Sequence, residues 1–292
     1  MSSKARMDVL PILALMATAL FWGLLWYPLR WLAEHGLPGL WATEVLFTSA
    51  LLLGSPLLWR YRGELALRPG LLVGLALTNG WCNTAFILAV LDGQVVRVML
   101  LFYLSPVWAV LLARLLLGER LPSLALVTLA LAMGGAIIIL WDPTLGMPWP
   151  RGHGDWLAIS SGVTFALSNV FIRMGEDLSI ALKTVTAWLG VTVLSGMLLI
   201  SGAGGHAEWN SAALSVAVAI GMVGIVLMSS CLVYGVSRMP VHRSAVILLF
   251  EVIVGAVSAQ WLAGEALGAR EWLGGVLILS AAWVASRQQL QD

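Results

Sequence analysis

The chain has 292 residues, of which 60% are hydrophobic and only 11% are charged. So few polar side chains cannot coat a soluble globule of this size, which excludes a soluble enzyme. The net charge of +1 at pH 7 comes without a basic patch, so nucleic acid is not expected as a partner.

Apolar stretches follow one another almost from end to end, and each is long enough to cross a bilayer as a helix. In chain order, the ten predicted membrane helices cover 9–30, 38–59, 70–91, 95–114, 121–141, 155–174, 180–201, 211–235, 242–262 and 270–286. The first is too long for a signal-peptide core and is expected to be retained. The sequence therefore predicts an all-α integral membrane protein with ten transmembrane helices.

Lysine and arginine residues predict the orientation. With ten crossings both chain ends lie on one side, and twelve of the sixteen Lys and Arg residues fall there. The four on the other side are Arg30, Arg97, Arg151 and Arg270. Because positive residues are retained on the inner side, we expect a multi-pass protein of the cell inner membrane with cytoplasmic N- and C-termini.

The chain also repeats itself at a spacing of 146 residues, the shift from 95 to 241. Val95 to Leu121 aligns without a gap on Val241 to Leu267, and Gly118-Glu119-x-Leu121 falls on Gly264-Glu265-x-Leu267. Each half holds five helices, an odd number, so the second half enters the membrane in the opposite sense. The predicted organisation is a first five-helix repeat over 9–141, an inter-repeat loop over 142–154 and a second, inverted repeat over 155–286.

The charged residues of the repeat lie at the membrane edges. We expect Glu119 and Glu265 to place their carboxylates against the positive end of the following helix, the fifth or the tenth. For the matched pair Arg97 and Arg243, helix capping and headgroup contact are preferred over a role as gates.

The paired motifs resemble the drug/metabolite transporter superfamily, and specifically its EamA-type members with ten transmembrane helices. The first copy reads Ser105-Pro106 ahead of Gly118-Glu119-Arg120-Leu121, and the second reads Glu251-Val252 ahead of Gly264-Glu265-Ala266-Leu267. The resemblance covers essentially the whole chain. Family members commonly have proline where Val252 stands, which puts a proline kink in the ninth helix in doubt.

The stretch FWGLLWYPLR in the first helix and the high tryptophan content are similar to the YddG-type amino-acid exporters. This resemblance implies export of amino acids, including aromatic and other apolar ones. Export of drugs or other small metabolites by the same machinery is the alternative.

Polar residues at mid-depth are the candidates for substrate contact, since a polar group in hydrocarbon is costly and normally faces a bundle interior. Glu251 lies about 15 Å from the start of its helix, near the bilayer centre. Binding of substrate or of a proton and a helix-packing role both remain open for it. Glu44 lies closer to its helix end and is expected to reach outward.

Further candidates lie on helices of both repeats. Asn79 and Asn83 share one helix face, and Ser229 lies one repeat length after Asn83. Aromatic residues could line the site for an apolar side chain. The full predicted substrate-binding set is Trp22, Trp26, Asn79, Asn83, Tyr103, Ser168, Asn169, Ser229, Ser230, Tyr234 and Glu251. The competing interpretation is that the serines bond to helix carbonyls and that the tryptophans face lipid.

These observations predict a transporter that works by alternating access around a midplane site between the repeats. Its partners would be amino acids and membrane lipid, with protons as a candidate coupling ion, and no cofactor or metal is expected. Cys82 and Cys231 lie inside predicted helices, where packing is preferred over a disulfide or a metal site. An enzyme is disfavoured because all four histidines lie in loops or at helix starts, and a channel because the sequence shows no charge ring or filter motif.

Overall fold

The computed structural model describes residues 9–93, 95–119, 122–141, 150–263 and 268–288, which form helices joined by turns and loops, with no strand among them. In these residues nine helical stretches are long and apolar enough to cross a membrane. A tenth helix, α14 (Ala269–Gln288), carries the shorter apolar stretch Trp272–Val284. The prediction of an all-helical, ten-span membrane protein is confirmed.

The helix boundaries lie close to the predicted ones. The first half consists of α1 (Val9–Glu34), α2 (Gly39–Arg60), the short α3 (Arg62–Leu65), α4 (Pro69–Asp92), α5 (Val95–Phe102), α6 (Ser105–Leu112), the π-helical turn η1 (Ala113–Leu117) and α7 (Ser123–Leu140). The second half consists of α8 (His153–Met174), α9 (Ile180–Ile200), α10 (Ser211–Ala219), the π-helical turn η3 (Ile220–Ile225), α11 (Val226–Arg238), α12 (Val241–Leu248), α13 (Phe250–Ala263) and α14. Residues 142–149 of the predicted inter-repeat loop and the second motif copy at 264–267 lie outside the described residues.

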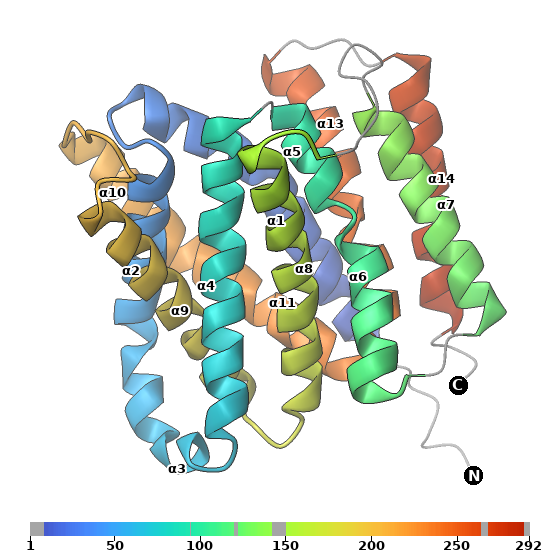
Figure 1. Ribbon diagram of the computed structural model, residues 1–292, viewed down its shortest axis with the longest axis horizontal. Helices are drawn as coiled ribbons and strands as arrows, with labels where there is room; N and C mark the ends of the chain where they lie inside the picture. Colours follow the sequence, from blue (N-terminus) through green and yellow to red (C-terminus); the bar gives the residue numbers. More distant parts are fainter. Residues whose placement is uncertain (1–8, 94, 120–121, 142–149, 264–267, 289–292) are drawn as a thin grey trace.

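One face of the helix bundle carries both ends of the described chain. The start of α1 and the end of α14 lie there, together with α3 and the connection between α8 and α9 (Figure 1). The turn between α4 and α5 lies at the opposite face. We call these the terminal face and the distal face.

The inverted repeat is visible in matched elements. α5 and α12 begin and end exactly one repeat length apart, since 95 plus 146 is 241 and 102 plus 146 is 248. Two similar hydrogen bonds also cross between the halves. Thr18 Oγ1 donates to the Met228 carbonyl at 3.1 Å, and Ser161 Oγ donates to the Cys82 carbonyl at 2.7 Å. The two acceptors are 146 residues apart and the two donors 143. The two halves therefore pack around a pseudo-twofold axis.

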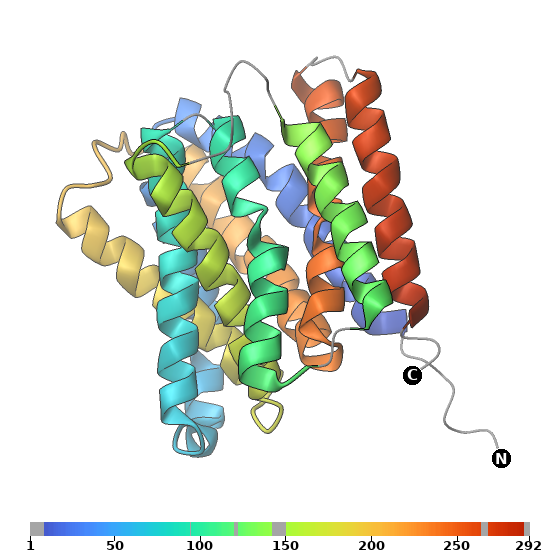
Figure 2. The same cartoon turned by 45° about the vertical axis from the view of Figure 1, so that its right-hand side comes forward.

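Glycines set the closest helix contacts, as is common where helices pack in lipid. A Cβ added to Gly190 of α9 would lie 1.9 Å from the Ala76 carbonyl oxygen of α4. In the same way, a Cβ on Gly135 of α7 would lie 2.5 Å from the Gly274 carbonyl oxygen of α14. Figure 2 shows α7 and α14 running side by side at one edge of the bundle. These helices touch backbone to backbone.

The fourth span of each half is broken at the same repeat position. α5 ends at Phe102 and α6 begins at Ser105, where Pro106 lacks the N–H that would continue the helix. α12 ends at Leu248 and α13 begins at Phe250 without a proline. There the Val252 N–H turns back to the Leu249 carbonyl at 3.0 Å. The ninth span is therefore interrupted even though the sequence supplies no proline for it.

Candidate functional site

The two helix breaks meet through a hydrogen bond between the halves. The Tyr103 hydroxyl, in the turn after α5, donates to Glu251 Oε1 at 2.9 Å. Glu251 is the second residue of α13 and lies ten residues after the start of α12. At 1.5 Å per residue this corresponds to a depth of about 15 Å, near the middle of a bilayer. Two of the predicted residues, one from each repeat, thus form one contact at the repeat interface.

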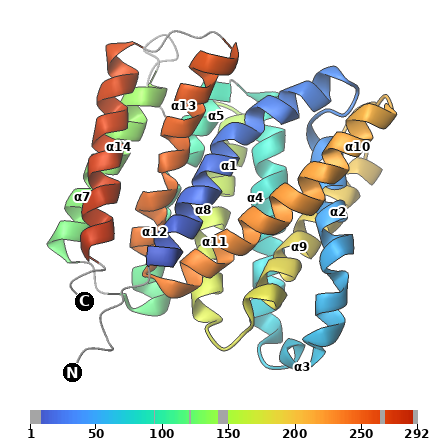
Figure 3. The same cartoon turned by 180° about the vertical axis from the view of Figure 1, so that it is seen from behind.

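The first helix of each half packs against the break of the other half. A Cβ on Gly23 of α1 would lie 2.8 Å from the Glu251 carbonyl oxygen, and a Cβ on Gly162 of α8 would lie 2.8 Å from the Phe102 carbonyl oxygen. Figure 3 shows α1 packed between α13 and α11. Both breaks are therefore enclosed by backbone of the opposite repeat.

The predicted tryptophan of α1 contributes to the same interface. Trp26 Nε1 donates to Ser258 Oγ of α13 at 2.9 Å. Toward the distal face, Trp26 also lines an open cavity of about 330 Å³ together with Tyr27, Trp31 and Leu262. No sequence pattern singles out Ser258, because an isolated serine in an apolar helix usually bonds to a carbonyl of its own helix.

A second polar contact lies between α4 and α8. Asn79 Nδ2 donates to Ser168 Oγ at 2.5 Å, and Asn83 Nδ2 donates to the Asn79 carbonyl at 3.0 Å. Asn169, next to Ser168, is only 2% exposed, and its Oδ1 accepts no hydrogen bond from the described residues. Since an unpaired buried amide oxygen is costly, this atom is a candidate acceptor for a polar group of a ligand.

The remaining predicted residues are not brought to these contacts. Trp22 packs edge-on against Phe21 with ring centroids 5.6 Å apart, in an apolar cluster with α2 and α9. Ser230 Oγ donates to the Val226 carbonyl of its own helix at 2.6 Å, as the packing interpretation expects. Ser229 is 9% exposed on the same helix. Tyr234 lies near the end of α11, with the Arg238 guanidinium 5.0 Å above its ring. A substrate role for these four stays a prediction.

Headgroup contact was expected for Arg97, the arginine of the first repeat, but the structure buries its side chain. Arg97 Nε donates to both oxygens of Asp155 at 2.9 and 2.8 Å, and both side chains are less than a tenth exposed. Asp155 also accepts from the Arg151 N–H at 2.8 Å. The expectation for Arg97 was wrong because its partner, 58 residues away at the start of α8, could not be paired from spacing alone. Arg243 is likewise buried.

The two glutamates at the helix ends also differ from expectation. Glu119 accepts from the Val241 N–H at 3.2 Å and lies 3.3 Å from His242 Nδ1, so its carboxylate faces the positive end of α12 and not that of the fifth span. Glu44 does not reach outward but accepts from Ser195 Oγ at 2.5 Å and Thr48 Oγ1 at 2.8 Å. The prediction that the Glu119 carboxylate lies at the positive end of a helix was correct, but that helix is α12 and not the fifth span. The matching Glu265 lies outside the described residues.

Comparison with known proteins gives the family. The model of the EamA-like transporter family matches residues 9–141 and 152–287 of this chain. The chain belongs to the EamA-like transporter family. An uncharacterized transporter of Archaeoglobus fulgidus is 27% identical over 225 residues, which cover 74% of this chain and 76% of that protein. One solved crystal structure is 17% identical with a TM-score of 0.78, covering 95% of this chain and 96% of the other, and shows the same fold.

The candidate site of this EamA-like transporter thus consists of polar groups held between two broken helices. The carboxyl group of Glu251 can accept a hydrogen bond or an ion pair from a cationic group, and Tyr103 fixes one of its oxygens. The starts of α6 and α13 add the partial positive charge of helix N-termini at the same breaks. Such a site can bind a small molecule that carries both charge signs.

Proposed function

We propose that this EamA-like transporter exports amino acids, including aromatic and other apolar ones, across the cell inner membrane. The terminal face is cytoplasmic in this proposal, because it carries most of the lysine and arginine residues. Transport proceeds by alternating access, with the two halves rocking around the site at the helix breaks.

The observation that carries the proposal is the contact between Tyr103 and Glu251. It joins the breaks of two discontinuous spans at mid-depth, which is where transporters built from inverted repeats hold their substrates. A carboxylate at this depth costs too much to be retained without a partner. The α-ammonium group of an amino acid is a suitable partner for it.

The other end of an amino acid finds complementary groups at the same breaks. Helix N-termini carry partial positive charge, which favours a carboxylate. The α6 and α13 helices both begin there. Trp26 and Tyr103 supply flat apolar surface for an aromatic or aliphatic side chain. Export of drugs or other small metabolites is the second candidate, since a cationic drug would also suit an acidic, aromatic site.

A transport panel tests the substrate class. The purified protein is reconstituted into proteoliposomes and offered labelled amino acids and a labelled cationic drug, with and without an imposed proton gradient. We expect saturable uptake of phenylalanine and leucine, lowered at least tenfold in Glu251→Gln. Glu208→Gln, at an exposed glutamate near the distal face, is the matched control and should transport normally. Uptake of the drug alone would instead favour the second candidate.

Thiol labelling tests the orientation independently of transport. In a background with Cys82→Ala and Cys231→Ala, Arg62→Cys should react with a membrane-impermeant reagent only from the cytoplasm, and His206→Cys only from outside. Both positions are exposed in the structure. His206 is preferred to the neighbouring Gly205, whose φ of 62° would strain a cysteine. Reversed labelling would show that the terminal face is external.

A further inference from the structure

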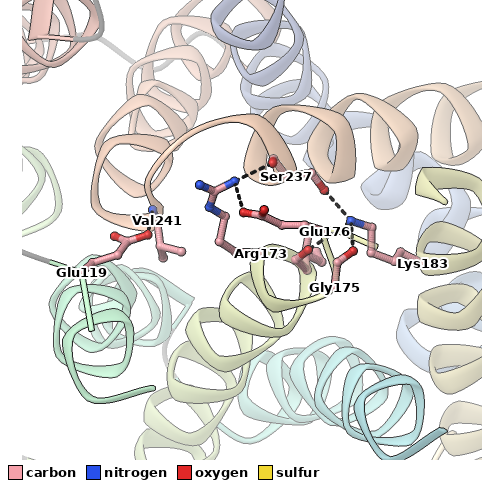
Figure 4. Close-up of polar contacts among 8 residues, drawn as sticks. Glu119, Arg173, Gly175, Glu176, Lys183, Ser237 and Val241 are labelled. Atoms are coloured by element: carbon pink, nitrogen blue, oxygen red, sulfur yellow. Dashed lines mark hydrogen bonds and ion pairs between the residues drawn. The ribbon is translucent and has the colours of Figure 1, made fainter. Parts of the chain in front are cut away.

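The terminal face carries a buried lysine that no transport step described above uses. Lys183 is the fourth residue of α9 and is only 1% exposed. Its Nζ donates to the carbonyls of Ile172 at 3.1 Å and Gly175 at 3.0 Å, and to Ser237 Oγ at 2.7 Å. In the sequence this lysine is one of the twelve positive residues on the side of the chain ends, and the structure places it between three helices (Figure 4).

An arginine holds the same serine from a second helix. Arg173, at the end of α8, donates through Nη1 to the Ser237 carbonyl at 2.8 Å and pairs with Glu176 at 2.7 Å. The end of α11 is thus attached by two cations, one from α8 and one from α9 (Figure 4). We call Arg173, Lys183 and Ser237 the clasp. Hydrogen bonds to charged groups are stronger than neutral ones, so the clasp resists separation of α11 from α8 and α9.

An apolar cluster and an open cleft lie next to the clasp. The cluster includes Leu15, Leu75, Ile172, Val236 and Met239, contributed by α1, α4, α8 and the end of α11. On the solvent side, a cleft of about 490 Å³ is lined by the clasp residues together with Ser179 and Arg238. Moving α11 away from α8 would therefore break the clasp and also expose this cluster to water.

The distal face is held by different contacts. With Thr18 matched to Ser161, the counterpart of Arg173 is Arg30 (173 minus 143), which pairs with Glu34 at 3.2 Å and has a side chain that is 64% exposed. The buried cation near that face is Arg97, which pairs with Asp155 and holds α5 to α8. The clasp instead holds α11 to α8 and α9, so it stabilises the conformer that is closed at the terminal face.

We propose that the clasp is the gate of the terminal face, and that it stabilises the conformer closed on that side. Lys183 and Ser237 hold the end of α11 in the closed position, and neither needs to touch substrate. A substrate arriving at the terminal face must find the clasp open. The inference rests on the alternating access of the proposed function, but not on amino acids being the substrate.

A cysteine reporter in the closed interface tests the gate. Val236→Cys is placed in the apolar cluster of the protein lacking Cys82 and Cys231, since Val236 is fully buried in the closed conformer. The rate of its reaction with a thiol reagent is measured in purified protein without substrate. Lys183→Met, which removes the ammonium but keeps an apolar chain, should raise the rate at least tenfold because charge-assisted hydrogen bonds are lost.

Two comparisons make the result decisive. Arg68→Met removes a cation of the same face that pairs with Asp177 at 2.9 Å but does not contact α11, and it should leave the rate unchanged. Ser237→Ala removes the hydroxyl that accepts a hydrogen bond from Lys183 Nζ, and it should also raise the labelling rate. It tests the gate independently if Lys183→Met fails to fold. Wild-type rates in folded Lys183→Met and Ser237→Ala would overturn the gate. Because no substrate is used, this outcome is distinct from a failure to transport amino acids.

Discussion

The close contact between α4 and α9 makes a sharp prediction for Gly190→Ala. The added Cβ would lie 1.9 Å from the Ala76 carbonyl oxygen, whereas such contacts essentially never fall below 3.0 Å. The helices must therefore separate by about 1.1 Å, the difference between the two distances. Overpacking of this kind costs up to about 3 kcal/mol, and the gain in helix propensity from glycine to alanine returns about 1 kcal/mol. A net loss of about 2 kcal/mol remains.

Thermal unfolding measures this loss. At about 2 to 4 °C per kcal/mol for a chain somewhat smaller than this one, Gly190→Ala should lower Tm by about 4 to 8 °C. Tryptophan fluorescence of the detergent-solubilised protein reports the transition. Gly134→Ala is the control, since a Cβ at Gly134 meets no atom within 4 Å, and its Tm should stay the same or rise slightly. Equal Tm values for Gly190→Ala and wild type would refute the backbone contact between α4 and α9.

Three further predictions concern the polar contacts. Asp155→Ala should lower the free energy of unfolding by about 3 to 5 kcal/mol, because it removes the buried carboxylate that pairs with Arg97. Thermal unfolding should show a smaller loss in the double variant Asp155→Ala/Arg97→Met than in Asp155→Ala alone. Asn79→Leu should reduce uptake in proteoliposomes at least tenfold with little loss of folded protein. Ser280→Ala, which removes only a bond within its own helix, should transport normally. Trp26→Phe keeps the aromatic ring but loses the bond to Ser258, so a weaker apparent affinity with normal expression is expected, and unchanged affinity would exclude this bond from the site.

The spans were predictable because hydrophobic length is a strong signal. The predicted 180–201 and the observed α9 (Ile180–Ile200) differ by one residue. The predicted helix ends were wrong where amphipathic turns extend a helix beyond its apolar part. The first helix was predicted to end at residue 30, whereas α1 continues to Glu34. Pro28 removes one backbone hydrogen bond and crowds the carbonyl four residues before it, yet the helix continues for six more residues.

The candidate site was only partly predictable. Glu251, Asn79 and Ser168 were singled out because polar groups at mid-depth are costly, and Tyr103 because it could line an aromatic site. These four form two of the contacts between the halves. Which residues pair could not be predicted, because pairing depends on how helices far apart in sequence cross.

Lys183 shows the opposite limitation. A lysine near a helix start normally reaches the surface, and only the carbonyl ends of α8 and the serine of α11 provide the oxygens that hold it inside. The break before α13 was equally hidden, because no proline marks it. Tertiary contacts decide both features.

Binding of labelled phenylalanine to the purified protein tests the central claim most directly. Tyr103→Phe and Glu251→Gln should each weaken binding at least tenfold, since both groups lie at the helix breaks. Tyr61→Phe, in the turn between α2 and α3, and Glu208→Gln are the matched controls and should bind as the wild type does. Wild-type affinity in folded Tyr103→Phe and Glu251→Gln would contradict the assignment of the substrate site to these breaks.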